Sequence, residues 1–213
     1  MRSASVALKS PPPRKAESGS TEPENLLALW LPGEDVIPFD EGAGLRLPAG
    51  AQLTVRVRYK KTWGYERKAM TDRSTVGVYF APSGSIVVRA LELAPAGVAG
   101  GVDREISFSR SLDEDRRVLA VYPGPAFANT RVHVRATRPD GSHVELIRFR
   151  PQPDWVRRYW FARPVALSRG TRIEVVAATD ETAVLAPPGA TPIAPKPLNP
   201  SSVRLTLDVV AER

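Results

Sequence analysis

The sequence of 213 residues contains no cysteine and only two histidines. The lack of cysteine excludes disulfide frameworks, thiol catalysis, haem attachment motifs and thiolate zinc fingers. A predicted tight turn separates His133 from His143, and about five strand residues at ~3.3 Å each keep the imidazoles on the order of 16 Å apart. Two imidazoles at that separation cannot share a metal ion, so we expect both to be ordinary surface or cleft residues.

Long apolar runs and familiar catalytic motifs are also absent. No stretch approaches the ~20 apolar residues of a membrane-spanning helix, and residues 3–8 after Arg2 are too short for the apolar region of a signal peptide. The sequence has no glycine-rich phosphate loop, GxSxG elbow or HExxH motif. The acidic run 113–115 lacks the ligand spacing of a calcium loop, and we interpret it as a solvated turn.

Positive charge predominates in the sequence, but the basic residues are not concentrated in one segment. The net charge is +7, but the basic residues are spread along the chain, and their strong bias toward arginine is also typical of a GC-rich coding sequence. A nucleic-acid partner is therefore not favoured by charge.

Proline is abundant, with 21 residues. Residues 1–25 combine serine, proline and charge with few aromatics, which predicts a flexible or extended tail. Pro11, Pro12 and Pro13 favour polyproline II within it. Such a segment can order on a partner surface.

Beyond the tail the dominant hydrophobic period is two. Leu53, Val55 and Val57 alternate with polar residues, the pattern of a half-buried strand. Further strands are predicted at 75–80, 86–93, 105–109, 117–122, 131–137, 143–149, 159–161, 171–178 and 203–210. Pro139-Asp140-Gly141 predicts a hairpin turn. No helical period persists, so the sequence predicts an all-β fold of the sandwich or jelly-roll type.

A loop rich in alanine, glycine and proline suggests the internal boundary. We expect a tail at 1–25, a first β-sandwich domain at 26–94, a linker at 95–102 and a second β-sandwich domain at 103–213. The first domain supplies about four or five strands, fewer than the eight of a complete jelly roll, so it is short or incomplete. Its exposed edges would invite pairing with another chain.

Aromatic residues provide the candidate contact points. Trp63 and Tyr65 lie in a lysine-containing loop and are expected to be exposed, as partner contacts often are. Trp155, Tyr159 and Trp160 flank two arginines and have two interpretations. They could stack on bases or bind cations, but the favoured interpretation is alternate packing into a sandwich core with arginines at its rim.

The order of these segments resembles the bacterial branch of the copper type II, ascorbate-dependent monooxygenases, relatives of peptidylglycine α-hydroxylating monooxygenase. The resemblance covers roughly residues 30 to 210. It is carried by Leu31-Pro32-Gly33, LRLPAG at 45–50, LTVRVRY at 53–59, TDRSTVGVYF at 71–80, VRATRPDG at 134–141, Trp155, Tyr159 and LSRGTRIEV at 167–175. It implies two jelly-roll-like antiparallel β-sandwich domains, each of which binds one copper in that family.

The resemblance also implies that the copper ligands are missing here. A family histidine that precedes tyrosine falls on Arg58, and a His-x-His pair falls on Gly124 and Ala126. Arginine offers no lone pair and carries a positive charge, while glycine and alanine have no ligating side chain. The family's methionine ligand would lie near 205–208, where there is none. No cofactor is therefore expected.

The leading hypothesis is a non-catalytic, monooxygenase-like accessory or structural subunit of a larger protein assembly. By analogy with exported relatives it would be periplasmic or extracellular, at the periplasmic side of a membrane. The expected partner-binding residues are Pro11, Pro12, Pro13, Trp63, Tyr65, Trp155, Tyr159 and Trp160. Two alternatives stay open: a copper- and ascorbate-dependent hydroxylase with ligands from another segment or chain, and a binder of polyanions or carbohydrate that uses Arg56, Arg58 and the 155–160 cluster.

Overall fold

The structure is a computed structural model, which describes residues 3–9, 25–35, 39, 42–95, 104–124, 130–151, 156–179, 198 and 203–212. The described residues form β-strands and a single 3-10 turn, so the all-β prediction is confirmed. Contacts divide the chain into two compact units, Met1–Val88 and Arg89–Arg213.

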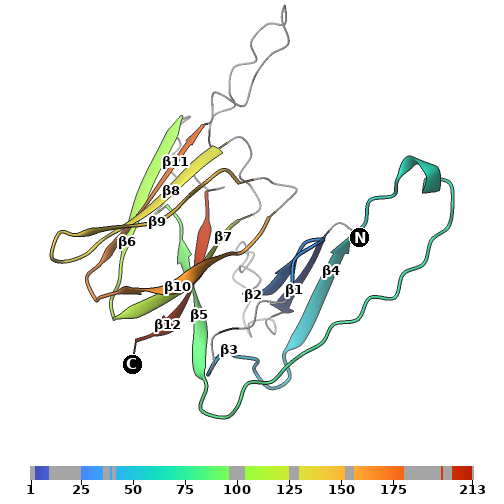
Figure 1. Ribbon diagram of the computed structural model, residues 1–213, viewed down its shortest axis with the longest axis horizontal. Helices are drawn as coiled ribbons and strands as arrows, with labels where there is room; N and C mark the ends of the chain where they lie inside the picture. Colours follow the sequence, from blue (N-terminus) through green and yellow to red (C-terminus); the bar gives the residue numbers. More distant parts are fainter. Residues whose placement is uncertain are drawn as a thin grey trace, which may run out of the picture. The chain divides into compact units, whose positions relative to one another are not determined.

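The first unit contains a three-stranded antiparallel sheet of order β2-β1-β4 (Figure 1). Its strands are β1 (Ser3–Lys9), β2 (Asn25–Trp30) and β4 (Gln52–Arg58). The short strand β3 (Ala43–Leu45) pairs in parallel with the first residues of β5 (Ile86–Leu93). The 3-10 turn η1 (Trp63–Tyr65) lies in the long connection from β4 to β5.

The structure differs from the expected tail at its beginning. The central strand β1 falls within residues 1–25 and pairs with both neighbours, Val6 lying opposite Ala28 of β2 and Val55 of β4. Ala4, Val6 and Leu8 alternate with Ser5 and Ala7, a short strand pattern that the proline and serine of the rest of the tail obscure. Residues 11–13 lie outside the described part of the chain.

The structure also differs from the sequence prediction at residues 75–80, where a strand was expected. These residues form no regular element, and their side chains are exposed. Alternation predicts an extended backbone with two unlike faces, but it does not supply the neighbouring strand that a sheet requires.

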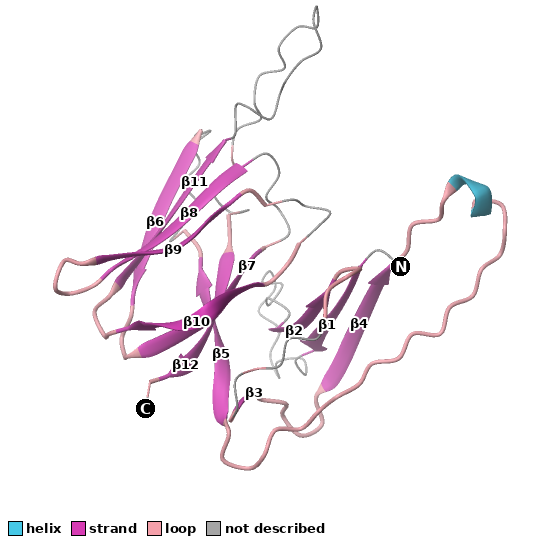
Figure 2. Ribbon diagram, viewed as in Figure 1, coloured by secondary structure: helices cyan, strands magenta, loops and turns pink. Residues whose placement is uncertain are grey.

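The second unit is built from two antiparallel sheets, drawn as two layers in Figure 2. One sheet has the order β10-β7-β12-β5, continued by β3, and the other has the order β6-β11-β8-β9. The strands are β6 (Glu105–Ser111), β7 (Arg116–Pro123), β8 (Thr130–Thr137), β9 (His143–Phe149), β10 (Tyr159–Leu167), β11 (Arg172–Thr179) and β12 (Leu205–Ala211).

The core of this unit lies between the two sheets. Every second residue of the inner strands is buried, and these residues are Val132, Val134 and Ala136 of β8, Ile173, Val175 and Ala177 of β11, and Leu205, Leu207 and Val209 of β12. Burying each valine, leucine or isoleucine contributes about 1.5–3 kcal/mol. This arrangement is consistent with the expected β-sandwich.

The hairpin predicted at Pro139-Asp140-Gly141 is confirmed, because β8 and β9 pair across it and Gly141 has φ 83°.

The boundary between the two compact units falls within β5, between Val88 and Arg89, whereas the sequence suggested a linker at 95–102. β5 continues past this boundary because Leu93 packs in the core of the second unit.

Candidate functional site

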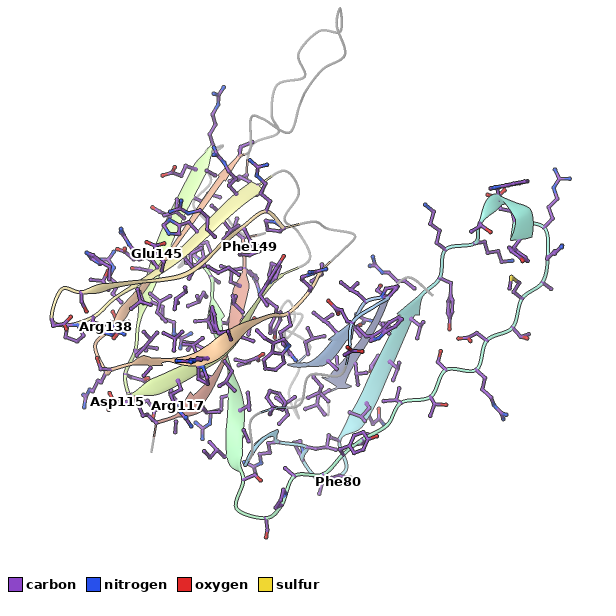
Figure 3. The ribbon with its side chains drawn as sticks, viewed as in Figure 1. Phe80, Asp115, Arg117, Arg138, Glu145 and Phe149 are labelled. Atoms are coloured by element: carbon purple, nitrogen blue, oxygen red, sulfur yellow. The ribbon has the colours of Figure 1, made fainter. Side chains whose placement is uncertain are left out.

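The connection between β4 and β5, residues 59–85, carries the most exposed large apolar side chains among the described residues of the first unit, and we call it the arm. Trp63 is 90% exposed, Tyr79 93% and Phe80 84%. Figure 3 labels Phe80 where the arm returns toward β5. Single exposed apolar residues are ordinary, but several large exposed aromatic residues on one segment make it the candidate interaction surface.

The outer end of the arm, residues 61–68, is a closed turn that we call the tip. The backbone N–H of Tyr65 donates to the Thr62 carbonyl at 2.9 Å, and that of Lys68 donates to the Tyr65 carbonyl at 3.0 Å. Lys61 Nζ closes the turn by donating to the Lys68 carbonyl at 2.7 Å. The tip therefore holds Trp63 in solvent on an ordered backbone, which lowers the entropy cost of binding through it.

The tip and its flanks are basic as well as aromatic. Residues 60–73 contain five lysines and arginines but only two acidic residues. The Lys68 ammonium lies 5.4 Å from the centroid of the Tyr65 ring, a cation–π contact. Aromatic and basic side chains together suit an acidic protein surface that also has an apolar pocket.

A polar clasp holds the base of the tip. The Tyr59 hydroxyl donates to the Asp72 carboxylate, and Ser74 Oγ donates to the same carboxylate oxygen at 2.7 Å. The Tyr59 and Ser74 hydroxyls are 3.2 Å apart. These two hydrogen bonds hold the pKa of the Asp72 carboxyl below its usual value, and the one from Tyr59 has the larger effect. The clasp brings the residue after β4 beside residues 72–74.

The aromatic cluster expected at 155–160 divides between two faces of β10. Tyr159 packs against the core, with its ring centroid 5.0 Å from that of Phe149. Trp160 instead has the Arg158 guanidinium over its ring at 5.7 Å, and the same guanidinium lies 5.1 Å from the Tyr122 ring. Trp155 lies outside the described residues.

Sequence reasoning missed the buried carboxyl group beside this cluster. Asp208 of β12 is only 2% exposed and forms an ion pair with Arg158. Its Oδ2 atom lies 2.9 Å from Nε of the arginine. Burial outweighs the nearby positive charge and raises the pKa of Asp208 to about 6. The only sequence signal was an aspartate among the apolar residues of 203–210.

The expected copper-ligand positions fall on unlike surroundings. Arg58 ends β4 opposite Ser3 and is exposed. Gly124 donates its N–H to the Arg204 carbonyl at 2.8 Å, and a Cβ at 124 would lie 3.2 Å from that oxygen. A histidine there would require the backbone around Arg204 to shift. Ala126 is outside the described residues.

The two histidines have separate partners. His133 Nε2 bonds to the Glu145 carboxylate, which lowers the pKa of Glu145, and His143 Nδ1 lies 3.1 Å from Thr137 Oγ1. Within the described ranges, histidine, aspartate and glutamate form no group of three that would suit a metal ion.

Among the described residues, none belongs to a helix long and apolar enough to cross a membrane. No protein-family model matches this chain, and no curated protein sequence matches it.

Proposed function

We propose that the chain is a non-catalytic accessory subunit that binds a larger protein assembly through the tip of its arm. The observation that carries the proposal is Trp63, 90% exposed on a turn closed by three hydrogen bonds. Tryptophan and tyrosine dominate the energetics of many protein interfaces, and an ordered turn presents them at low entropic cost.

The partner surface is expected to be acidic around an apolar pocket. Trp63 would enter the pocket, while Lys60, Lys61 and Arg67 would face the acidic rim. Charged rim residues mainly increase the rate of association and make it sensitive to salt, whereas the buried aromatic residue supplies most of the affinity.

The relation to the copper monooxygenases remains part of this proposal, and it rests on the sequence resemblance. The same resemblance supports a location at the periplasmic side of a membrane or outside the cell. The packing of Gly124 against Arg204 supports a chain that does not bind copper at that position.

Site-specific photo-crosslinking in the producing cells tests the proposal. A photoreactive benzoylphenylalanine in place of Trp63 is expected to give discrete protein adducts. The matched control carries the same probe in place of Asp113, an exposed residue in a turn of the second unit. With the probe placed at Tyr65 instead, Trp63→Ala should reduce the adduct yield at least fivefold relative to the chain that retains Trp63. Adducts that are absent, or identical from positions 63 and 113, would overturn the proposal.

The alternative of copper-dependent hydroxylation has its own readout. Metal analysis of the natively purified chain and its complex would show stoichiometric copper, with ascorbate-dependent turnover, if another segment or chain supplied the ligands. That result would replace the proposal of a non-catalytic subunit.

A further inference from the structure

The outer edge of β4 has no neighbouring strand within the described part of the chain. β4 pairs with β1 along its whole length, and its other edge is open. An edge strand presents unpaired N–H and C=O groups to any extended segment that reaches it. The described residues give this sheet three strands, near the minimum for independent stability.

The arm contains an extended segment of matching character, Ser74–Phe80, which we call the return segment. Figure 1 shows it running from the tip back toward β5, opposite in direction to β4. It has the alternating pattern of a strand, with Val76, Val78 and Phe80 separated by Gly77 and Tyr79. Its apolar side chains are exposed in this structure.

The clasp indicates how the two segments would align. The Tyr59 and Ser74 hydroxyls are 3.2 Å apart, so these residues already lie side by side at one end. Antiparallel pairing continued from that contact places Val57 opposite Val76 and Val55 opposite Val78, and the last pair is Leu53 with Phe80.

This register gathers the apolar residues on one face of the sheet. On that face β1 already places Ala4, Val6 and Leu8 opposite the three apolar residues of β4. A slip by one residue would place Val78 on the face that carries Arg56, and Gly77 or Tyr79 opposite Val55. Because every side chain changes face with such a slip, hydrophobic matching selects the one register.

The return segment is also held near β4 at its far end. A Cβ added at Gly44 would lie 3.2 Å from the Ala81 Cβ, so the residue after the return segment packs against β3. A short turn, closed by the Ala51 N–H donating to the Pro48 carbonyl at 3.1 Å, leads from β3 into β4. With both ends held, pairing requires little additional loop-closure entropy.

We propose that the return segment is a strap that closes onto the open edge of β4 as the fourth strand of this sheet, in the register Tyr59–Ser74 to Leu53–Phe80. The arm then has an open state, seen here, and a closed state in which Val76, Val78 and Phe80 leave solvent. Closure turns the arm into a hairpin with the tip at its end. The consequence for partner binding rests on the proposed function, whereas the strand pairing does not.

Paired cysteines test the closure directly, because the chain has none of its own. Val55→Cys with Val78→Cys joins positions that are opposite in the proposed register. Mild oxidation at low micromolar protein should give an intramolecular disulfide, seen as loss of both thiols and as a crosslinked peptide pair. Val57→Cys with Val76→Cys is an independent second pair.

Val55→Cys with Gly77→Cys is the matched control, one residue out of register. We expect it to form the disulfide at least tenfold more slowly. Equal rates for the two pairs, or no disulfide in either in-register pair, would overturn the proposal. Disulfide-linked dimers would also overturn it, because the strand would then come from a second copy.

The photo-crosslinking assay keeps the two proposals separate. With the 55–78 disulfide formed and a photoreactive probe at position 63, the adducts report partner binding from the closed arm. Adducts without any in-register disulfide would overturn the strap alone. A disulfide that forms in a chain giving no adducts in either the oxidised or the reduced state would overturn the proposed function and leave the strap in place.

Discussion

At the scale of single residues, Asp208 shows what burial does to a charge within a sheet. The carboxyl group lies among the apolar residues of β12, and Arg158 is its ion-pair partner at 2.9 Å. The pKa of Asp208 nevertheless rises to about 6, so desolvation outweighs the attraction between the two charges. Buried ion pairs often contribute little net stability for this reason.

The raised pKa predicts a pH-dependent contribution to stability. The folded state binds a proton to Asp208 below pH ~6, whereas the unfolded chain does so only below ~3.9, so this group stabilises the fold as pH falls between those values. The gain approaches about 2 kcal/mol near pH 4. Asp208→Asn should lack that component.

The measurement is the difference in unfolding free energy between the original chain and Asp208→Asn, taken from urea titrations from pH 7 to pH 4. The difference cancels the opposite contributions of Asp72, Asp140, Glu145 and Glu174, whose pKa values are lowered. A difference that stays constant over this range would contradict a raised pKa at Asp208.

At the scale of elements, β1 determines whether the first unit has a sheet. It is hydrogen-bonded to β2 on one side and to β4 on the other, and nothing else among the described strands joins those two. Ala7 and Leu8 are buried, while the side chains of β4 are mostly exposed. The strand least visible in the sequence is therefore the one on which the sheet depends.

Val6→Pro should consequently disrupt the whole three-stranded sheet. Proline removes a ladder N–H and is incompatible with the central strand of a sheet. We expect amide hydrogen-exchange protection to be lost in both β2 and β4 but retained in β8 and β11. Thr71→Pro, in the irregular part of the arm, is the control and should leave β2 and β4 protected. Persistent protection of β2 and β4 in Val6→Pro would disprove the central role of β1.

The elements that the sequence predicted well are those with one face in the core. β8 and β11 alternate in burial because one side packs between the sheets and the other meets solvent or polar partners. β12 departs from this pattern, because its residues 207–210 are all buried. Pairing was less predictable, because the alternation at 75–80 is equally compatible with a paired strand and an open strap. Likewise, no local signal identified Arg158 as the partner of Asp208, because 50 residues separate them in the chain. The two residues come together because β7 pairs with both β10 and β12.

At the scale of the whole chain, positive charge and exposure coincide in the arm. The net charge of +7 is distributed along the sequence, but residues 60–73 carry five basic side chains on backbone that is exposed throughout. In the second unit, by contrast, Arg131, Arg135 and Arg172 lie in paired strands. A protease that cleaves after basic residues should distinguish these two settings, because cleavage requires a locally unfolded backbone.

Limited trypsin digestion of the full chain should therefore cut residues 60–73 before it cuts any basic site in β6 to β12. Lys60 and Arg73 should be cleaved earliest, whereas Lys61, Arg67 and Lys68 lie in the closed tip and should follow. Oxidising the Val55→Cys, Val78→Cys chain should slow the cut after Arg73 and leave the tip accessible, because closure orders only the return segment. Early cleavage within β8 or β11 would instead mean that the second unit opens as readily as the arm, contrary to its buried core.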